Sequence, residues 1–224
     1  MKFSSAQESA LSHKDGPMMV LAGPGSGKTT VITHRIKKLL EQGASPSGIL
    51  VITFTKAAAG EMKDRFSGLM RQAGCQGEKG DWSRVSFGTF HAIFYQILRL
   101  AYGFRPGSVL GEEEKRRFFK EYINRSEFEV EDEGEFIASL VNEISYVKGN
   151  RLDLGCYYSC NCPEEWFKKL YQEYEDMLGR LGKIDFDDIL TMCYELFLER
   201  KDILKAWQKK YRYILVDEFQ DINR

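Results

Sequence analysis

The sequence predicts an α/β protein in which a parallel sheet is interrupted by an all-helical segment. Short apolar runs at 18–22, 49–53 and 85–87 each end in small or polar residues, and helix-forming stretches follow them. This pattern is typical of strands buried in a parallel sheet. No strand pattern is evident from 102 to 183, and a last apolar run at 213–216 returns to the strand pattern.

Size and composition are those of an ordinary soluble globular protein. The chain has 224 residues, of which 43% are hydrophobic and 29% charged, enough for one or two domains. No apolar run approaches the roughly 20 residues that span a bilayer, and the N-terminus lacks the apolar core of a signal peptide. We therefore expect a cytoplasmic, monomeric protein without a membrane partner. A net charge of −1 does not exclude nucleic acid, since phosphate contacts need only a local basic groove.

The five cysteines do not suggest a disulfide framework, because their number is odd and their spacing uneven. Cys156, Cys160 and Cys162 cluster as C-x₃-C-x-C, which raises the question of zinc. No histidine lies nearby, however, and the usual C-x₂-C spacing is missing. The spacing favours reduced loop cysteines, and metal binding stays open.

A short helix is predicted from Phe3 to Ser12, one connection before a glycine-rich turn. Gln7 lies on this helix. Its amide both donates and accepts hydrogen bonds, which matches the N6/N7 edge of adenine. Most exposed glutamines have no specific role, so this feature is weak by itself.

The glycine-rich turn after residues 18–22 predicts a phosphate-binding loop. Glycines leave the backbone N–H groups open to a ligand, and the following helix start contributes its dipole. Lys28 is placed to reach the β- and γ-phosphates, and the Thr29 hydroxyl to ligate Mg²⁺. We expect ATP and Mg²⁺ at Ala22, Gly23, Pro24, Gly25, Ser26, Gly27, Lys28, Thr29 and Thr30. The alternative is a glycine turn that merely connects a strand to a helix.

Two further strand ends carry candidate motifs. The run at 49–53 leads into Phe54, Thr55 and Lys56 before a helix begins, and the run at 85–87 leads into Gly88-Thr89-Phe90-His91. Ligands of open α/β sheets bind outside the carboxyl ends of the strands. These motifs should therefore lie along one edge of one sheet. Lys63, Arg65 and Arg71 make the helix after Lys56 basic, which we interpret as a solvated face.

The middle of the chain predicts amphipathic helices at 112–123, 136–147 and 164–181. About 80 residues are enough for a small domain. Asp185 then predicts an N-cap, with Asp187 and Asp188 in the first helical turn.

Two acids follow the last strand-like run. Asp217 would hold Mg²⁺, and Glu218 would orient and deprotonate an attacking water. The alternative is an acidic turn, but strand-Asp-Glu and a phosphate loop in one chain favour an ATPase.

With these motifs, the chain resembles the superfamily 1 DNA helicases of the UvrD/Rep type. The resemblance rests on six segments in the family's order: a glutamine motif at Phe3, Gln7 and Ala10, then segments at 22–29, 53–62, 88–91, 185–188 and 215–223. They cover both ends of the chain, while the helical middle matches only in length and placement.

The resemblance implies a RecA-like domain, called 1A, at 1–103 and 184–224, interrupted by a helical domain, 1B, at 104–183. It implies ATP at Gln7, Lys28, Thr29, Asp217 and Glu218, with Gln220 as a sensor between the γ-phosphate and the DNA. It also implies single-stranded DNA or a DNA duplex junction as the partner, and a nucleic-acid track lined by Phe54, Thr55, Lys56, Thr89 and His91. A ring such as Phe54 can stack on any base.

Three departures from the family pattern are visible. Thr30 replaces an arginine that packs on adenine, and Lys56-Ala57 replaces Asn-Lys. The chain also stops at Arg224, before the later motifs and the C-terminal RecA-like domain, its expected partner. We therefore expect the front part of a longer helicase, which binds ATP, hydrolyses it very slowly and does not unwind DNA alone.

Other functions stay open at this point. This half of the sequence does not distinguish the helicase from a P-loop ATPase of another kind, such as a helicase–nuclease subunit or an RNA-acting enzyme. It also fits a nucleic-acid-binding module that nucleotide merely stabilises. Preference for DNA or RNA depends on contacts to the sugar 2′-OH, which no motif here reports.

Overall fold

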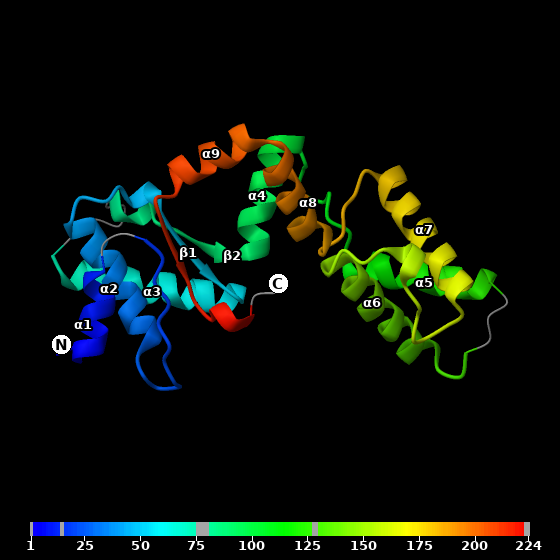
Figure 1. The fold of residues 1–224 in the computed structure, drawn as a ribbon, viewed down its shortest axis with the longest axis horizontal. Coiled ribbons are helices and arrows are strands. Elements are labelled where there is room, and N and C mark those ends of the chain that lie inside the picture. The colour runs from blue at the N-terminus through cyan, green and yellow to red at the C-terminus, as the bar shows by residue number, and fades with distance from the viewer. Residues whose placement is uncertain (1, 14–15, 75–80, 127–129, 222–224) are drawn as a thin grey trace. The chain divides into compact units, whose positions relative to one another are not determined.

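The computed structural model describes residues 2–13, 16–74, 81–126 and 130–221. By its internal contacts the chain divides into two compact units (Figure 1). The first unit consists of Met1–Ala92 and Arg200–Ile222, and the second is built on Ile93–Glu199. The chain is thus a mixed α/β protein with a small parallel sheet and mostly helices.

The sheet belongs to the first unit. Its strands are β1 (Ile49–Thr53), β2 (Ser86–Thr89) and β3 (Tyr213–Val216), in the order β2-β1-β3 and all parallel. Every residue of β1 is buried, as expected for the central strand of a parallel sheet. Thr53 pairs with Thr89, and Ile52 pairs with Val216, so the three carboxyl ends lie in one row.

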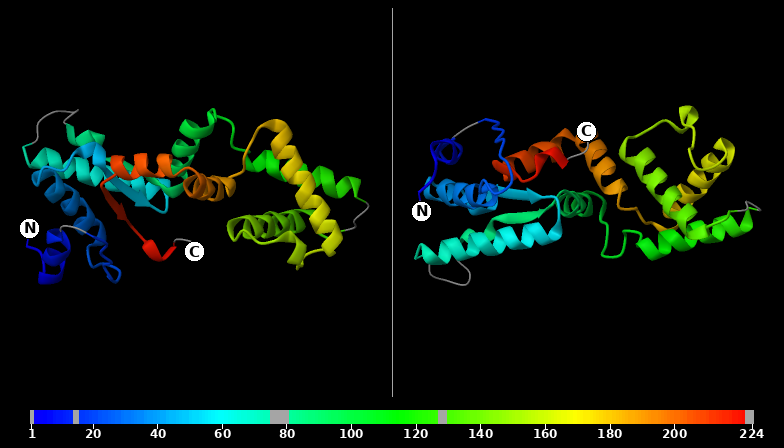
Figure 2. Two further views of the ribbon diagram at one scale, coloured as in Figure 1. Left: turned by 45° about the horizontal axis from the view of Figure 1, so that its top comes forward. Right: turned by 90° about the horizontal axis from the view of Figure 1, so that it is seen from below.

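Helices α1 (Ser5–Ser12), α2 (Lys28–Glu41), α3 (Lys56–Gln72) and α9 (Lys201–Lys210) complete the first unit. It also holds the 3-10 helices η1 (Pro46–Gly48), η2 (Asp81–Arg84) and η4 (Phe219–Asp221). Helices α2 and α3 lie beside each other and pack their apolar stripes against the sheet (Figure 2). This core comprises Ile36, Leu39, Ile49, Val51, Met62, Phe66, Met70 and Val85.

The apolar run before the glycine-rich turn differs from its prediction as a strand. Residues 17–23 have no regular structure, and Met19 and Leu21 are 70% and 89% exposed. An apolar run becomes a strand only where a neighbouring strand pairs with its backbone. Among the described residues β3 is paired with β1 alone, and the run makes no ladder with the other edge of β3.

Helices make up the regular structure in the described part of the second unit, apart from an isolated β-bridge between Val109 and Ile184. Its helices are α4 (Phe90–Tyr102, from Ile93 onward), α5 (Glu112–Arg125), α6 (Glu133–Gly149), α7 (Glu164–Leu181) and α8 (Asp188–Glu199), with the 3-10 helix η3 (Leu154–Cys156). The helices predicted in this region are confirmed. Their shared core comprises Leu110, Phe119, Tyr122, Ile123, Ile137, Leu140, Ile144, Val147, Phe167, Leu170, Tyr174 and Leu178.

The segments that lead into and out of α5–α7 are paired with each other. The N–H of Leu110 donates to the carbonyl of Ile184 at 2.8 Å, and the N–H of Ile184 donates to the carbonyl of Ser108 at 2.9 Å. The unit extends beyond this pairing on both sides, because α8 packs against α6. The division by contacts therefore falls next to Ala92 and Glu199, wider than the predicted 104–183.

The chain enters α8 through a reciprocal cap. The N–H of Asp188 donates to Asp185 Oδ1 at 2.9 Å, and the N–H of Asp185 donates to Asp188 Oδ2 at 2.8 Å. Two backbone donors that the helix leaves unpaired are thereby satisfied. Asp185 has the capping contact predicted for it, but α8 begins only at Asp188, so Asp187 precedes the helix and does not lie in its first turn.

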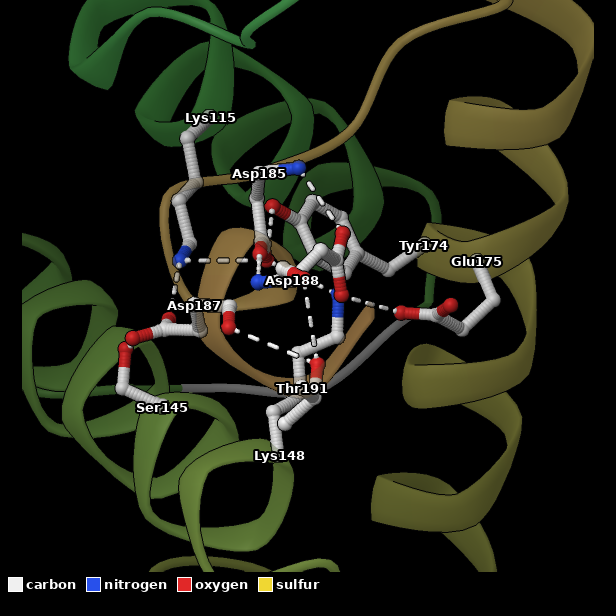
Figure 3. A network of polar contacts seen from close by, with 9 residues as sticks. All are labelled: Lys115, Ser145, Lys148, Tyr174, Glu175, Asp185, Asp187, Asp188 and Thr191. Atoms are coloured by element: carbon white, nitrogen blue, oxygen red, sulfur yellow. Dashed lines mark hydrogen bonds and ion pairs between the residues drawn. The ribbon is translucent and has the colours of Figure 1, made fainter. Parts of the chain in front are cut away.

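The second carboxylate oxygen of Asp185 lies in a buried ionic network (Figure 3). The Lys148 ammonium lies 2.9 Å from Asp185, 2.7 Å from Asp188 and 2.7 Å from Glu175. The Tyr174 hydroxyl donates to Asp185 at 3.1 Å, and Lys115 approaches the same oxygen at 3.7 Å. The residues that begin α8 are thus held by α5, α6 and α7.

Burial and charge act in opposite directions on these groups. Burial alone would lower the pKa of Lys148, but the surrounding carboxylates outweigh it and the pKa is raised. Burial, together with the charge of Asp185, raises the pKa of Asp188 to about 6. Burial would also raise the pKa of Asp185, yet the two lysines hold it below its ordinary value.

Candidate nucleotide-binding site

The glycine-rich turn has the backbone that a phosphate loop requires. Gly25 and Gly27 have φ angles of 74° and 83°, in the left-handed region that glycine adopts without strain. Gly27 is the N-cap of α2, and no side chain caps the free N–H groups of the first turn. An uncapped helix N-terminus attracts anions through these N–H groups and its dipole.

An open pocket of about 250 Å³ lies at this helix start. It is lined by Gly25, Ser26, Gly27, Lys28, Thr29, Thr30 and Arg65. Six of these belong to the predicted loop, whereas Ala22, Gly23 and Pro24 lie outside the lining. Thr30 lies in the first turn of α2, where its carbonyl accepts a hydrogen bond from the Thr33 hydroxyl at 3.0 Å.

Arg65 is the residue that sequence analysis missed. It comes from the third turn of α3 and pairs with Glu61 at 2.5 Å on the same helix. A guanidinium beside a phosphate loop suits a polyphosphate, because its planar fork matches phosphate oxygens. Helical periodicity alone gave no sign of its position, since a basic helix face usually meets only solvent.

Lys28 meets Glu218, an acid from the far end of the chain, and Asp217 precedes that acid in sequence. The Lys28 ammonium lies 2.9 Å from Glu218 Oε1 and 3.1 Å from Oε2, and both side chains are about one-third exposed. Asp217 extends the pairing of β3 with β1, since its N–H donates to the carbonyl of Ile52 at 2.9 Å. The parallel sheet thus brings together residues that the helical unit separates in sequence.

The two acids have opposite electrostatic settings. Hydrogen bonds from Gln220 and Lys28 hold the pKa of Glu218 below its ordinary value, and Gln220 Nε2 lies 2.6 Å from Glu218 Oε2. Burial and the neighbouring charge of Glu218 raise the pKa of Asp217, with Lys28 opposing them weakly. A carboxylate crowded by negative charge favours a nearby cation.

The donor set fits Mg²⁺. Thr29 and Asp217 offer oxygen ligands, and Mg²⁺ usually binds through one or two protein groups together with water and phosphate oxygens. Among the described residues no three His, Cys, Asp or Glu side chains are grouped to hold a metal by themselves. That finding also gives no support to zinc at the cysteines, of which Cys156 and Cys160 are exposed.

Gln7 lies against the loop. Its Nε2 donates to the carbonyl of Ser26 at 3.0 Å, while its Oε1 accepts from the N–H of Ser4 at 2.9 Å in a capping box. The Gln7 amide also lies 3.4 Å from where a Cβ on Gly27 would be. Helix α1 is thereby tied to the phosphate loop through this one side chain.

The residues predicted to line a nucleic-acid track lie at the carboxyl ends of β1 and β2. Phe54 is 61% exposed, and Lys56 is exposed at the start of α3. The hydroxyls of Thr55 and Thr89 accept from backbone N–H groups in the first turns of α3 and α4, at 3.1 Å and 3.2 Å. His91 is half-buried in the first turn of α4.

A glycine loop at a helix start, with an acid pair at the end of a neighbouring parallel strand, defines the P-loop class of nucleotide-binding domains. The family model of the UvrD/REP helicase N-terminal domain matches residues 3–224. The chain belongs to this family.

Proteins similar to this chain are named as DNA helicases. The chain is 38% identical to the putative ATP-dependent DNA helicase YjcD of Bacillus subtilis, over 97% of this chain and 28% of that protein. It is 34% identical to DNA helicase II of Haemophilus influenzae, over 93% and 29%, and 33% identical to the ATP-dependent DNA helicase PcrA of Staphylococcus aureus, over 99% and 30%. The chain thus spans about 30% of the length of these curated relatives.

In the part of the chain that the structure describes, no helix is both long and apolar enough to cross a membrane.

Proposed function

We propose that this chain is the ATP-binding N-terminal part of a DNA helicase that moves along single-stranded DNA and unwinds duplex. One observation supports this most strongly. The lysine of the glycine-rich loop and Glu218, the second residue after β3, meet at 2.9 Å, although 190 positions separate them in sequence. The names of the relatives favour DNA over RNA as the nucleic acid.

Each site residue has its own role toward a bound nucleotide. Lys28 binds the β- and γ-phosphates, with the N–H groups of the loop around it, and Arg65 adds a second cation. Thr29 and Asp217 hold Mg²⁺, which supplies positive charge to the phosphate oxygens when it is bound. Glu218 orients the attacking water and accepts its proton.

Gln220 and Gln7 are positioning residues in this scheme. The Gln220 amide holds the Glu218 carboxylate by a hydrogen bond, which ties the base to the turn after β3. Gln7 fixes the loop through Ser26. Its Oε1 and Nε2 both have partners in the protein, so recognition of adenine by Gln7 requires these bonds to rearrange.

Single-stranded DNA would lie along the row of strand ends, at Phe54, Thr55, Lys56, Thr89 and His91. The register of β1 with β2 supports this, because it aligns Thr53, directly before Phe54, with Thr89 of the second motif. The exposed Phe54 ring offers a stacking surface for a base.

In the proposed architecture a RecA-like domain is interrupted by a helical domain near 104–183. The backbone pairing of Ser108 and Leu110 with Ile184 supports this arrangement. Unwinding would need a second RecA-like domain as partner, because the family's second domain supplies arginines to the nucleotide. Such an arginine can raise the rate of phosphoryl transfer by a factor on the order of 10³–10⁵.

Nucleotide binding tests the proposal. Lys28→Ala should abolish binding of Mg·ADP in calorimetry, because the main cation of the phosphate loop is removed. Lys37→Ala is the matched control on the same helix, where Lys37 pairs with Glu41 at 3.5 Å. Equal affinity for Lys28→Ala and the unaltered chain would reject the site.

A further inference from the structure

Helix α9 lies away from the candidate nucleotide site, at the amino ends of the strands. Beyond its last residue, the Tyr211 hydroxyl lies 3.1 Å from the hydroxyl of Ser86, the first residue of β2. The N–H of Arg212 donates to the carbonyl of Gly48, directly before β1, at 2.9 Å. In Figure 1, β3 runs from this end of α9 to the opposite edge, where Asp217 follows it.

One side of α9 carries a stripe of lysines. Lys201, Lys205 and Lys209 recur every fourth residue, so their side chains lie on one face, about 6 Å apart along the helix axis. All three are exposed, and α9 has no buried residue. The helix contains one acid, Asp202, which Arg200 holds in a two-pronged contact at 2.9 and 2.7 Å.

Lys205 and Lys209 differ from several other cations of the first unit, which have acidic partners. Lys38 of α2 pairs with Glu8 at 3.4 Å, and Arg65 of α3 pairs with Glu61. Within the described part of the chain, neither Lys205 nor Lys209 forms an ion pair with an acid. Pairs at i,i+4 spacing would stabilise a solvated helix face, and these two lysines do not form them.

Helix stability does not account for the stripe either. Cations favour the last turn of a helix and are unfavourable in the first turn, where the dipole is positive. Lys209 is explained by this effect, but Lys201 at the first position of α9 is opposed by it.

The stripe is presented by a fixed helix end. The rings of Trp207 and Tyr211 stack with centroids 5.8 Å apart, and the Lys210 ammonium lies 4.4 Å and 4.8 Å from the two centroids. Tyr211 itself is buried. This arrangement holds the end of α9 against the unit and leaves the stripe turned to solvent.

We propose that the lysine stripe of α9 (Lys201, Lys205 and Lys209) binds the phosphate backbone of nucleic acid, as a second contact surface apart from the row of strand ends. The inference rests on the proposed helicase function. A row of evenly spaced ammonium groups with few acids among them suits a polyanion, and lysines contact phosphates as point charges without reading bases. Binding at this surface is therefore independent of sequence and weakens with salt.

Charge reversal tests the stripe in the full chain. Lys205→Glu with Lys209→Glu should weaken binding of a labelled DNA oligonucleotide at least tenfold at low salt, measured by anisotropy. The slope of log affinity against log salt should shrink by about 1.5, since each lost phosphate contact accounts for roughly 0.7–0.9. Affinity for Mg·ADP should not change. The control with equal charge change is Lys120→Glu with Lys169→Glu, two exposed lysines of the helical unit.

The inference is overturned if the reversed variant loses no DNA affinity, or if the control loses as much. If DNA affinity is unchanged and polyglutamate binds to the stripe, the partner is an acidic protein instead. If circular dichroism shows that the reversed variant is unfolded, Lys205→Gln with Lys209→Gln should give a smaller loss and the same change of slope. Failure here leaves the Lys28→Ala result untouched, so the two proposals fail separately.

Discussion

Two ionic clusters in this molecule have similar chemistry and opposite surroundings. Lys148 and Asp185 in the helical unit have side chains only 5% and 1% exposed, whereas Lys28 and Glu218 are 35% and 36% exposed. Three carboxylates surround the buried lysine: Glu175 of α7, and Asp185 and Asp188 at the start of α8. The open pair lies beside a solvent-filled pocket.

The difference separates a structural ion pair from an exchangeable one. Removing one partner of a buried pair leaves a charge without compensation in a low dielectric, whereas an exposed pair contributes little because water replaces it. Lys148 therefore fixes the helical unit, while Lys28 can exchange Glu218 for a phosphate without loss of the fold. Variants of each cluster should fail in different ways.

The largest effect is expected for Lys148→Met. The substitution keeps the length of the side chain but leaves Asp185, Asp188 and Glu175 without their shared cation. Loss of one partner from a buried pair typically costs about 3–5 kcal/mol in the free energy of unfolding. Urea denaturation monitored by circular dichroism measures it. Lys120→Met, which breaks the exposed pair with Glu133 at 3.1 Å, should cost less than about 1 kcal/mol. Equal losses would contradict the comparison.

The second prediction concerns pH. The folded-state pKa of Asp188, about 6, lies above that of an unfolded aspartate, so the folded chain binds the proton more tightly. Stability should therefore rise, on the order of 2 kcal/mol, as the pH falls from 7 toward 4. The folded-state pKa of Asp185 is depressed instead, so its contribution is lost as the pH falls below the ordinary range of aspartate.

Urea midpoints measured across this pH range check the profile. Asp188→Asn, which imitates the protonated side chain, should flatten the rise between pH 7 and 5 and leave the acid loss in place. A profile with no maximum in the unaltered chain would show that the buried acids do not titrate as their surroundings indicate.

The smallest effect is expected for Glu218→Gln. Without the carboxylate, Lys28 loses an intramolecular partner that competes with phosphate, so Mg·ADP should bind more tightly, by less than about tenfold. Calorimetry with ADP avoids any effect of hydrolysis. Gln220→Ala keeps the Lys28–Glu218 pair and serves as the control. Weaker binding by Glu218→Gln would mean that the pair assists nucleotide binding and does not oppose it.

Local pattern was enough to predict some features and not others. The apolar run of β1 and the cap at Asp185 depend on neighbours in sequence, and both were predicted. The partners of Asp185 were not, because Lys115 and Lys148 lie on other helices and no spacing relates them to it. Arg65 was missed for the same reason.

The run at 18–22 is a case in which the local pattern predicted a strand that the structure does not contain. Its apolar residues favour a strand, but strand formation depends on backbone pairing with another segment, which hydrophobicity alone does not determine. The position of the phosphate loop was nevertheless predictable, because its glycines and the start of α2 are set locally.

Glu218 has a φ angle of 52°, in the left-handed region that few residues other than glycine occupy. The Glu218 carboxylate, the base of the proposed mechanism, is thus aimed by an unfavourable backbone, which the pairing of Asp217 with Ile52 and the contact with Lys28 hold in place. Relaxation of this one peptide would turn the carboxylate away while the helices and the sheet stay intact. Chemical competence should therefore be lost under milder conditions than the global fold.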